Sequence, residues 1–69
     1  MRIHDVWLVD RNDGEEYELY DNEEEALSRM VEIVEETEGV VSEMMAQLYR
    51  SAGEYSEDPY NTVRVIYVS

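Results

Sequence analysis

Apolar residues at helical spacing run through the middle of the chain, and this stretch is the strongest constraint on the fold. At about 100° per residue, several of them share one side of a helix. They are Leu27, Met30, Val31, Val34, Val41, Met45 and Leu48. The phase continues across Gly39. The pattern therefore predicts one helix from about Glu23 to Ser51, whose apolar side needs a surface to pack against.

Gly39 leaves two interpretations of this stretch open. In the favoured one, the helix continues through Gly39, with or without a kink there. In the other, a first helix ends near Glu38, Gly39 follows its C-cap, and a second helix begins near Ser42.

The length of a continuous helix has a consequence for assembly. About 29 helical residues span roughly 43 Å, whereas an eight-residue strand spans roughly 26 Å. The helix would then extend beyond its own sheet and expose apolar side chains, which dimerisation would cover. This hypothesis places a homodimer interface at Val41, Met44, Met45 and Leu48. If the helix instead breaks and folds back, the same residues are buried in the monomer.

The start of the helix has clear signals. Asn22 is a good N-cap residue, and Glu25, three positions later, completes a capping-box pattern. Glu23, Glu24 and Glu25 also suit the positive end of the helix dipole. Capping therefore accounts for this acidic triplet, and contact with a partner is a second role open to it.

Two strands precede the helix. Residues Ile3 to Asp10 form a run rich in β-formers that is apolar on both faces, which suits a sheet with both sides at least partly covered. Asn12-Asp13-Gly14 is a strong turn signal. A second strand follows over about Glu15 to Tyr20, so the pair should form an antiparallel hairpin.

The last strand completes the expected architecture. Ser51 to Asn61 is expected to be a loop, and Thr62 to Val68 alternates as a strand that fits beside the first one. The predicted fold is α+β in the order ββαβ, with a three-stranded antiparallel sheet of order 2-1-3 packed on one face by the long helix. The 69 residues (1–69) make one domain, and a hydrophobic share of 43% is enough for a core.

Charge limits the partners of this domain. Eighteen acidic residues face five basic ones, which gives a net charge of −13. Such a field repels nucleic acid and anionic membranes, and it attracts basic protein surfaces. A general origin is the competing explanation, since salt-adapted organisms and arginine-favouring genomes also produce acidic, lysine-free proteins.

The residues for common chemistries are missing from the sequence. There is no cysteine, His4 is the only histidine, and the serines lie in no nucleophile motif. Asp10 to Gly14 resembles a calcium loop, but its glycine is in the wrong position. We expect no enzyme activity, no metal and no cofactor. We also expect a cytoplasmic protein, because no apolar run reaches about 18 residues and no signal-peptide pattern opens the chain.

The acidic residues cluster along the chain and define a candidate partner-binding surface. They lie in the second strand and helix start, along the helix, and in the loop before the last strand. The candidates are Glu15, Glu16, Glu18, Asp21, Glu24, Glu32, Glu35, Glu36, Glu54, Glu57 and Asp58. Carboxylates held several ångströms apart on a rigid frame can imitate the phosphates of a duplex.

The leading functional hypothesis follows from size and charge. It is a non-enzymatic, DNA-mimic-like inhibitor that occupies the basic, nucleic-acid-binding surface of a target protein. Small phage anti-CRISPR and anti-restriction proteins of this type have this size and charge. The alternative is an acidic homodimeric structural or assembly module of a halophile or phage, without DNA mimicry. Salt dependence separates the two, because mimicry weakens as salt rises whereas a halophilic fold gains stability.

Overall fold

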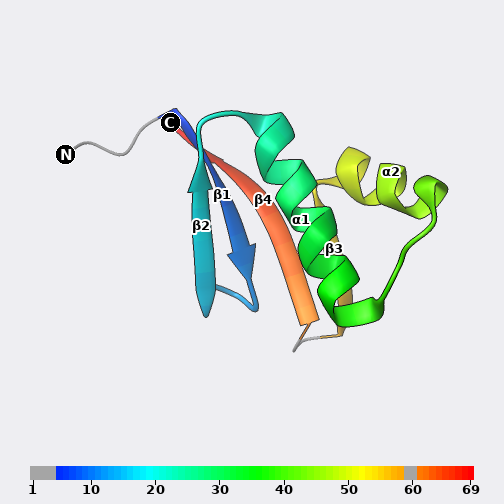
Figure 1. Cartoon of the computed structure of the whole chain (residues 1–69). Helices are drawn as coiled ribbons and strands as arrows, with labels where there is room; N and C mark the ends of the chain where they lie inside the picture. Colours follow the sequence, from blue (N-terminus) through cyan, green and yellow to red (C-terminus); the bar gives the residue numbers. More distant parts are fainter. Residues whose placement is uncertain (1–4, 59–60) are drawn as a thin grey trace.

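The computed structural model describes residues 5–58 and 61–69, which form a four-stranded antiparallel sheet with two helices on one side (Figure 1). The strands are β1 (Val6–Arg11), β2 (Glu16–Tyr20), β3 (Glu54–Asp58) and β4 (Asn61–Val68). The helices are α1 (Glu23–Glu38) and α2 (Glu43–Ala52). The strand order is β2-β1-β4-β3. The predicted three-stranded sheet under one long helix is therefore wrong.

The helix breaks at Gly39, so the continuous-helix interpretation is wrong and the two-helix alternative is right. Gly39 has φ 86° and donates its backbone N–H to the carbonyl of Glu35 at 2.9 Å. Glycine adopts such a positive φ without steric cost. Ser42 then caps α2, because its hydroxyl accepts the backbone N–H of Met45 at 3.2 Å. The chain folds back at this point, and α2 packs beside α1 (Figure 1).

The second correction concerns β3, which forms within the segment that was predicted to be a loop. Gly53, with φ 71°, ends α2 and turns the chain toward the sheet. β3 then pairs with β4, and Tyr55 is the one buried side chain among Glu54 to Glu57. A strand that buries one residue has almost no alternating apolar pattern, so backbone pairing with β4 decides its structure.

The predicted turn between β1 and β2 is confirmed. Asn12 and Asp13 have φ values of 51° and 56°, and Gly14 follows with φ 90°. Asn12 also ties this turn to β4. Its backbone N–H donates to the carbonyl of Thr62 at 2.9 Å, and its side-chain oxygen accepts the backbone N–H of Thr62 at 3.1 Å. Ile3 and His4, in the predicted first strand, lie outside the described residues.

The core lies between α1 and one face of the sheet. Its largest fully buried side chains are Met30, Ile33 and Val34 from α1 and Val9 from β1. Ala26, Val31, Tyr55 and Val63 complete it. Tyr49 of α2 meets the ring of Tyr55 edge-on at 5.2 Å, which joins α2 to the same core.

In the part of the chain that the structure describes, no helix covers the other face of the sheet (Figure 1), although Asp10 and Thr62 on that face are only 8% exposed. Side chains alternate between the two faces along a strand. The buried Val9 points toward the helices, so its neighbour Leu8 points away from them. Leu8 pairs with Leu19 on β2 and with Ile66 on β4, which places a row of three apolar side chains across this open face. Leu19 and Ile66 are 45% and 39% exposed. β1 is thus apolar on both faces, as its sequence indicates, while the helices of the described chain pack on one of them (Figure 1).

Two methionines provide a matched test of this core. We predict that Met30→Ala, which removes a fully buried side chain, lowers the free energy of unfolding by about 2–5 kcal/mol. Met44→Ala removes the same atoms from a side chain that is 74% exposed, and should change stability by less than about 0.5 kcal/mol. Urea unfolding of both variants measures the difference, and equal losses would contradict the described packing.

Candidate functional site

Acidic side chains are concentrated on one part of the fold. β2 and α1, with the sequences EYELY and EEEALSRMVEIVEETE, hold nine glutamates and one arginine. These elements carry half of the 18 acidic residues of the chain. We call the surface formed by the outer side of α1 and the helix-facing side of β2 the acidic face. It comprises Glu16, Glu18, Glu24, Glu25, Glu32 and Glu36.

Arg29 lies at the centre of the acidic face and holds three carboxylates together. Its Nε and one terminal nitrogen bond the two oxygens of Glu18 at 2.9 and 3.2 Å. Its other terminal nitrogen bonds Glu32 at 3.2 Å and Glu36 at 3.1 Å. Glu32 and Glu36 follow Arg29 by three and seven positions, so the helix places them on one side. The cluster carries one positive and three negative charges, and it joins β2 to α1.

The contacts of Glu18 keep its carboxylate charged. The hydrogen bonds from Arg29 hold the pKa of the Glu18 carboxyl below its usual value, and the hydroxyl of Tyr20, which also donates to it, lowers that pKa further. The same contacts raise the pKa of Arg29, whose guanidinium therefore stays protonated.

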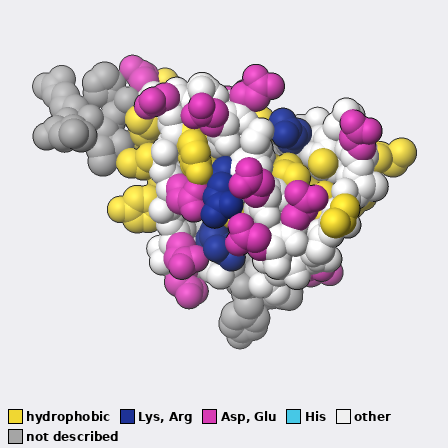
Figure 2. Space-filling model, in the orientation of Figure 1, with side chains coloured by type: hydrophobic (Ala, Val, Ile, Leu, Met, Phe, Trp, Pro, Cys, Tyr) yellow, Lys and Arg dark blue, Asp and Glu magenta, His cyan; other side chains and the backbone are white. Residues whose placement is uncertain are grey.

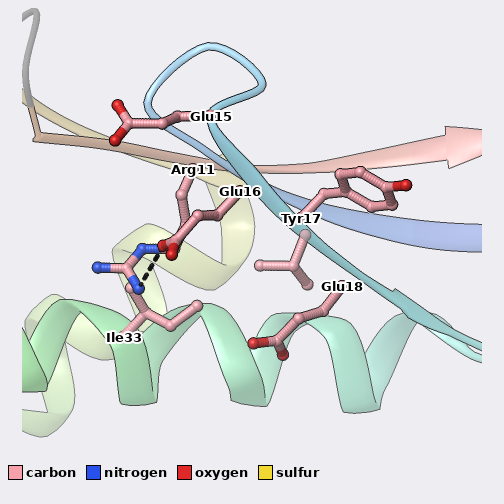
Figure 3. A pocket seen from close by; sticks show the side chains of 7 residues that line it. Arg11, Glu15, Glu16, Tyr17, Glu18 and Ile33 are labelled. Carbon is pink, nitrogen blue, oxygen red and sulfur yellow. Dashed lines mark ion pairs between the residues drawn. The ribbon is translucent and has the colours of Figure 1, made fainter.

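A hollow of about 360 Å³ lies beside this cluster, between the β1–β2 hairpin and α1. Figure 3 shows Glu16 and Glu18 turned toward the helix, while Tyr17 between them turns away. Glu16 pairs with Arg11 at 3.3 Å, and Ile33 forms the apolar floor. A second, more open hollow begins on the other side of Arg29 and is lined by Glu24, Glu25 and Glu32.

Basic side chains appear in the middle of the acidic face and acidic ones surround them (Figure 2). Arg11 and Arg29 both form ion pairs with neighbouring carboxylates. An arginine held in this way organises carboxylates without reversing the sign of the surface. The arrangement can therefore present a fixed group of acceptor oxygens to a cationic partner.

The structure divides the predicted partner-binding residues into two groups. Those of the hairpin and α1 lie around or next to the acidic face: Glu15, Glu16, Glu18, Asp21, Glu24, Glu32 and Glu36. Glu35 is half-buried on α1. Glu54 and Glu57 lie on β3, at the opposite edge of the sheet from β2. Asp58 ends β3, and its side chain lies outside the described part.

Carboxylates near β3 have a role inside the fold. The hydroxyl of Tyr55, which is only 4% exposed, donates to Glu38 at 2.5 Å and contacts Glu57 at 3.2 Å. Burial raises the pKa of the Tyr55 hydroxyl, and the hydrogen bond with Glu38 raises it further. Glu38 and Glu57 therefore stabilise the position of a core aromatic residue.

Sequence reasoning missed Glu25, Arg29 and Arg11 as parts of the site. The sequence pattern assigns Glu25 to helix capping, and its backbone N–H donates a hydrogen bond to the side-chain oxygen of Asn22 at 2.8 Å. Its side chain nevertheless lines the second hollow. The spacing of Arg29 from Glu32 and Glu36 was the available signal. The pairing of Arg29 with Glu18 depends on the tertiary fold, so the sequence held no signal for it.

The predicted dimer residues lie on or just before α2. Met44, Met45 and Leu48 are 74%, 40% and 56% exposed, whereas Val41 packs partly against the core. The overhanging helix that motivated a dimer at this place does not exist, because α2 folds back beside α1. The exposed apolar side chains of α2 remain (Figure 2).

Two other kinds of site are not found among residues 5–58 and 61–69. No group of three or more acidic or histidine side chains is arranged to hold a metal ion. Within the same residues, neither helix is both long and apolar enough to cross a bilayer.

Comparisons with known proteins add no family to this description. No protein-family model, curated protein or solved structure matches the chain.

The ion pair at the centre of the acidic face predicts a pH effect. Since the pKa of Glu18 is lowered in the folded state, its contribution to stability is complete above the unfolded value of about 4.3. That contribution is lost as the pH falls through the lower folded value. We predict that the wild-type protein is more stable than Glu18→Gln at pH 6 and that the difference shrinks toward pH 2.

Urea midpoints of the two proteins at several pH values measure this difference. Glu57→Gln is the control, because Glu57 has no arginine partner in the described structure. A difference between wild type and Glu18→Gln that stays constant from pH 6 to pH 2 would contradict the role given to Arg29.

Proposed function

We propose that this protein is a non-enzymatic binding domain whose acidic face occupies a basic surface of another protein, one that normally binds nucleic acid. The observation that carries the proposal is the uneven placement of charge. Nine glutamates accompany one arginine in β2 and α1, while the apolar row Leu19, Leu8 and Ile66 crosses the open face. A solvating charge shell would have no reason to favour one side.

The charge density along α1 supports a nucleic-acid-like surface. Sixteen helical residues span about 24 Å, and α1 supplies four glutamates to the acidic face, one per roughly 6 Å of axis. With Glu16 and Glu18 of β2 beside them, the carboxylates of the face follow about every 4 Å, and the paired Arg11 and Arg29 reduce the net charge to one per roughly 6 Å. One strand of B-DNA carries a phosphate every 3.4 Å or so. A protein groove that tracks phosphates would therefore meet carboxylates at a comparable spacing on the acidic face.

Rigidity supports the same proposal. Arg29 fixes the relative positions of Glu18, Glu32 and Glu36 across two elements, so these carboxylates lose little conformational freedom on binding. Preorganised charge contributes more to affinity than mobile charge, because less entropy is lost when the complex forms. Electrostatic complementarity should also speed association at low salt.

The test is affinity capture from a lysate of the source cells at low ionic strength, followed by elution with a 20-base-pair DNA duplex. We predict that the captured protein is released by the duplex and by about 0.5 M NaCl, since both compete for the same basic surface. Capture of proteins that the duplex does not displace would contradict mimicry of nucleic acid.

Matched variants locate the surface. Glu24→Gln with Glu25→Gln removes two charges that have no internal ion pair in the described structure, and should weaken capture at least tenfold. Glu43→Gln with Glu54→Gln removes the same charge elsewhere, and Glu43 lies in the first turn of α2, which matches half of the helix-dipole cost of the first pair. Equal weakening by both pairs would show that total charge, not the acidic face, controls binding.

A second candidate is an acidic homodimeric module whose charge serves solvation. The exposed apolar side chains of α2 and of the open sheet face favour it. Thermal unfolding separates the candidates: stability that rises steeply between 0.1 and 3 M KCl supports salt adaptation, whereas a flat response supports a dedicated acidic surface.

A further inference from the structure

The open face of the sheet is apolar where an exposed sheet face is usually polar. Strands with one face in water normally alternate between apolar and polar residues. Here Val6 and Leu8 of β1, Leu19 of β2, and Ile66 and Val68 of β4 all point away from the helices. Tyr17, which is 65% exposed, extends this surface at β2. Apolar side chains of this kind are expected on a sheet face that another surface covers.

Charge on the open face is confined to the end of the sheet near the β1–β2 turn, where three carboxylates lie near one arginine. Asp10 pairs in register with Arg64, and Arg64 pairs with Glu54 on its other side. Arg64 also bonds Asp13 of the adjacent turn at 3.0 Å. Arg64 is therefore the one basic side chain beside three carboxylates, Asp10, Glu54 and Asp13. In the described strands, the rows nearer Val6 and Val68 hold no ionisable side chain on this face.

This distribution decides which partner fits. A basic surface is drawn to the acidic face, and an acidic surface is repelled by a chain of net charge −13. The open face instead suits a flat apolar surface with little net charge. A second copy of the chain supplies such a surface, and stacking through it keeps both acidic faces on the outside.

We propose that two copies of this chain associate by stacking their open sheet faces about a two-fold axis parallel to the strands. Such an axis keeps each row of side chains over the same row of the other copy. The apolar row Leu19, Leu8 and Ile66 then meets its own copy, and so does the row that holds Asp10, Arg64 and Glu54, which carries one positive and two negative charges. The product is a sandwich with the helices on its two outer sides.

The area that two stacked sheet faces would bury indicates how tightly the two copies associate. Strands lie about 4.8 Å apart and rise about 3.3 Å per residue, so this sheet is roughly 20 Å on a side. Two stacked faces then bury on the order of 1,000 Å², near the lower limit for a specific interface. The expected dissociation constant is therefore weak, on the order of 100 µM.

Salt distinguishes this association from binding of a basic partner. Two copies repel each other through their net charge, and added salt screens that repulsion. We expect association of the copies to strengthen between 0.05 and 0.5 M NaCl, whereas capture through the acidic face should weaken. The two proposals use different surfaces, so either can fail without the other.

The test is sedimentation equilibrium of the full chain from about 5 to 500 µM. The wild-type mass should rise from 8.2 kDa toward twice that value, more strongly at high salt. Leu19→Lys with Ile66→Lys should weaken association at least tenfold. Met44→Lys with Leu48→Lys is the matched control, because it adds the same charge at exposed apolar residues of α2 and should leave association unchanged.

A second pair of variants covers the case in which lysine disturbs the sheet. Leu19→Thr with Ile66→Thr keeps residues that favour strands while removing apolar surface, and should also weaken association. A wild-type protein that stays monomeric at 500 µM in high salt overturns the proposal. So does association that is lost in the α2 variant and kept in the sheet variants.

Discussion

The packing of α1 against one face of the sheet is the contact on which the rest of this structure depends. Met30, Ile33 and Val34 of the helix are fully buried against a sheet whose central strand supplies Val9. The two helices of this 69-residue chain form a single layer on that face, and the other face of the sheet stays open (Figure 1). The break at Gly39 has the same cause, because it allows α2 to pack beside α1 in that layer.

Charge placement follows from this layering. The outer side of α1 cannot contribute to the core, and it is there and on β2 that the glutamates gather. Concentrating like charges on one surface costs stability. Arg29 offsets part of that cost by holding three of the carboxylates, and Arg11 pairs with a fourth, Glu16. The surface remains strongly negative and becomes ordered.

Much of the local structure could be predicted because short-range signals specify it. The Asn12-Asp13-Gly14 turn, the Asn22 cap and the position of the last strand beside β1 all follow from turn chemistry, capping and alternation. The helix break could not be decided, because the apolar phase continues across Gly39 and only packing of α2 on α1 selects the broken form. β3 could not be predicted at all, since Tyr55 is the one buried side chain among Glu54 to Glu57.

The candidate site was predictable to the extent that it is continuous in sequence. Glu16, Glu18 and Glu24 come from neighbouring segments, and the fold places them close together. Glu54 and Glu57 were grouped with them by charge alone, and the four-strand order puts them at the other edge. The pairing of Arg29 with Glu18 joins residues eleven positions apart through the tertiary fold, and no periodicity encodes it.

The central claim is that the acidic face, as an ordered surface, meets a basic partner. Its most direct test is a titration of the isotope-labelled protein with an arginine-rich peptide, followed through the backbone amide signals in two-dimensional NMR. We expect the signals of α1 and β2 around Glu18, Glu24 and Glu32 to shift first and farthest, while those of β3 and of the open face stay in place. Shifts of equal size over all surfaces, or shifts centred on β3, would contradict it.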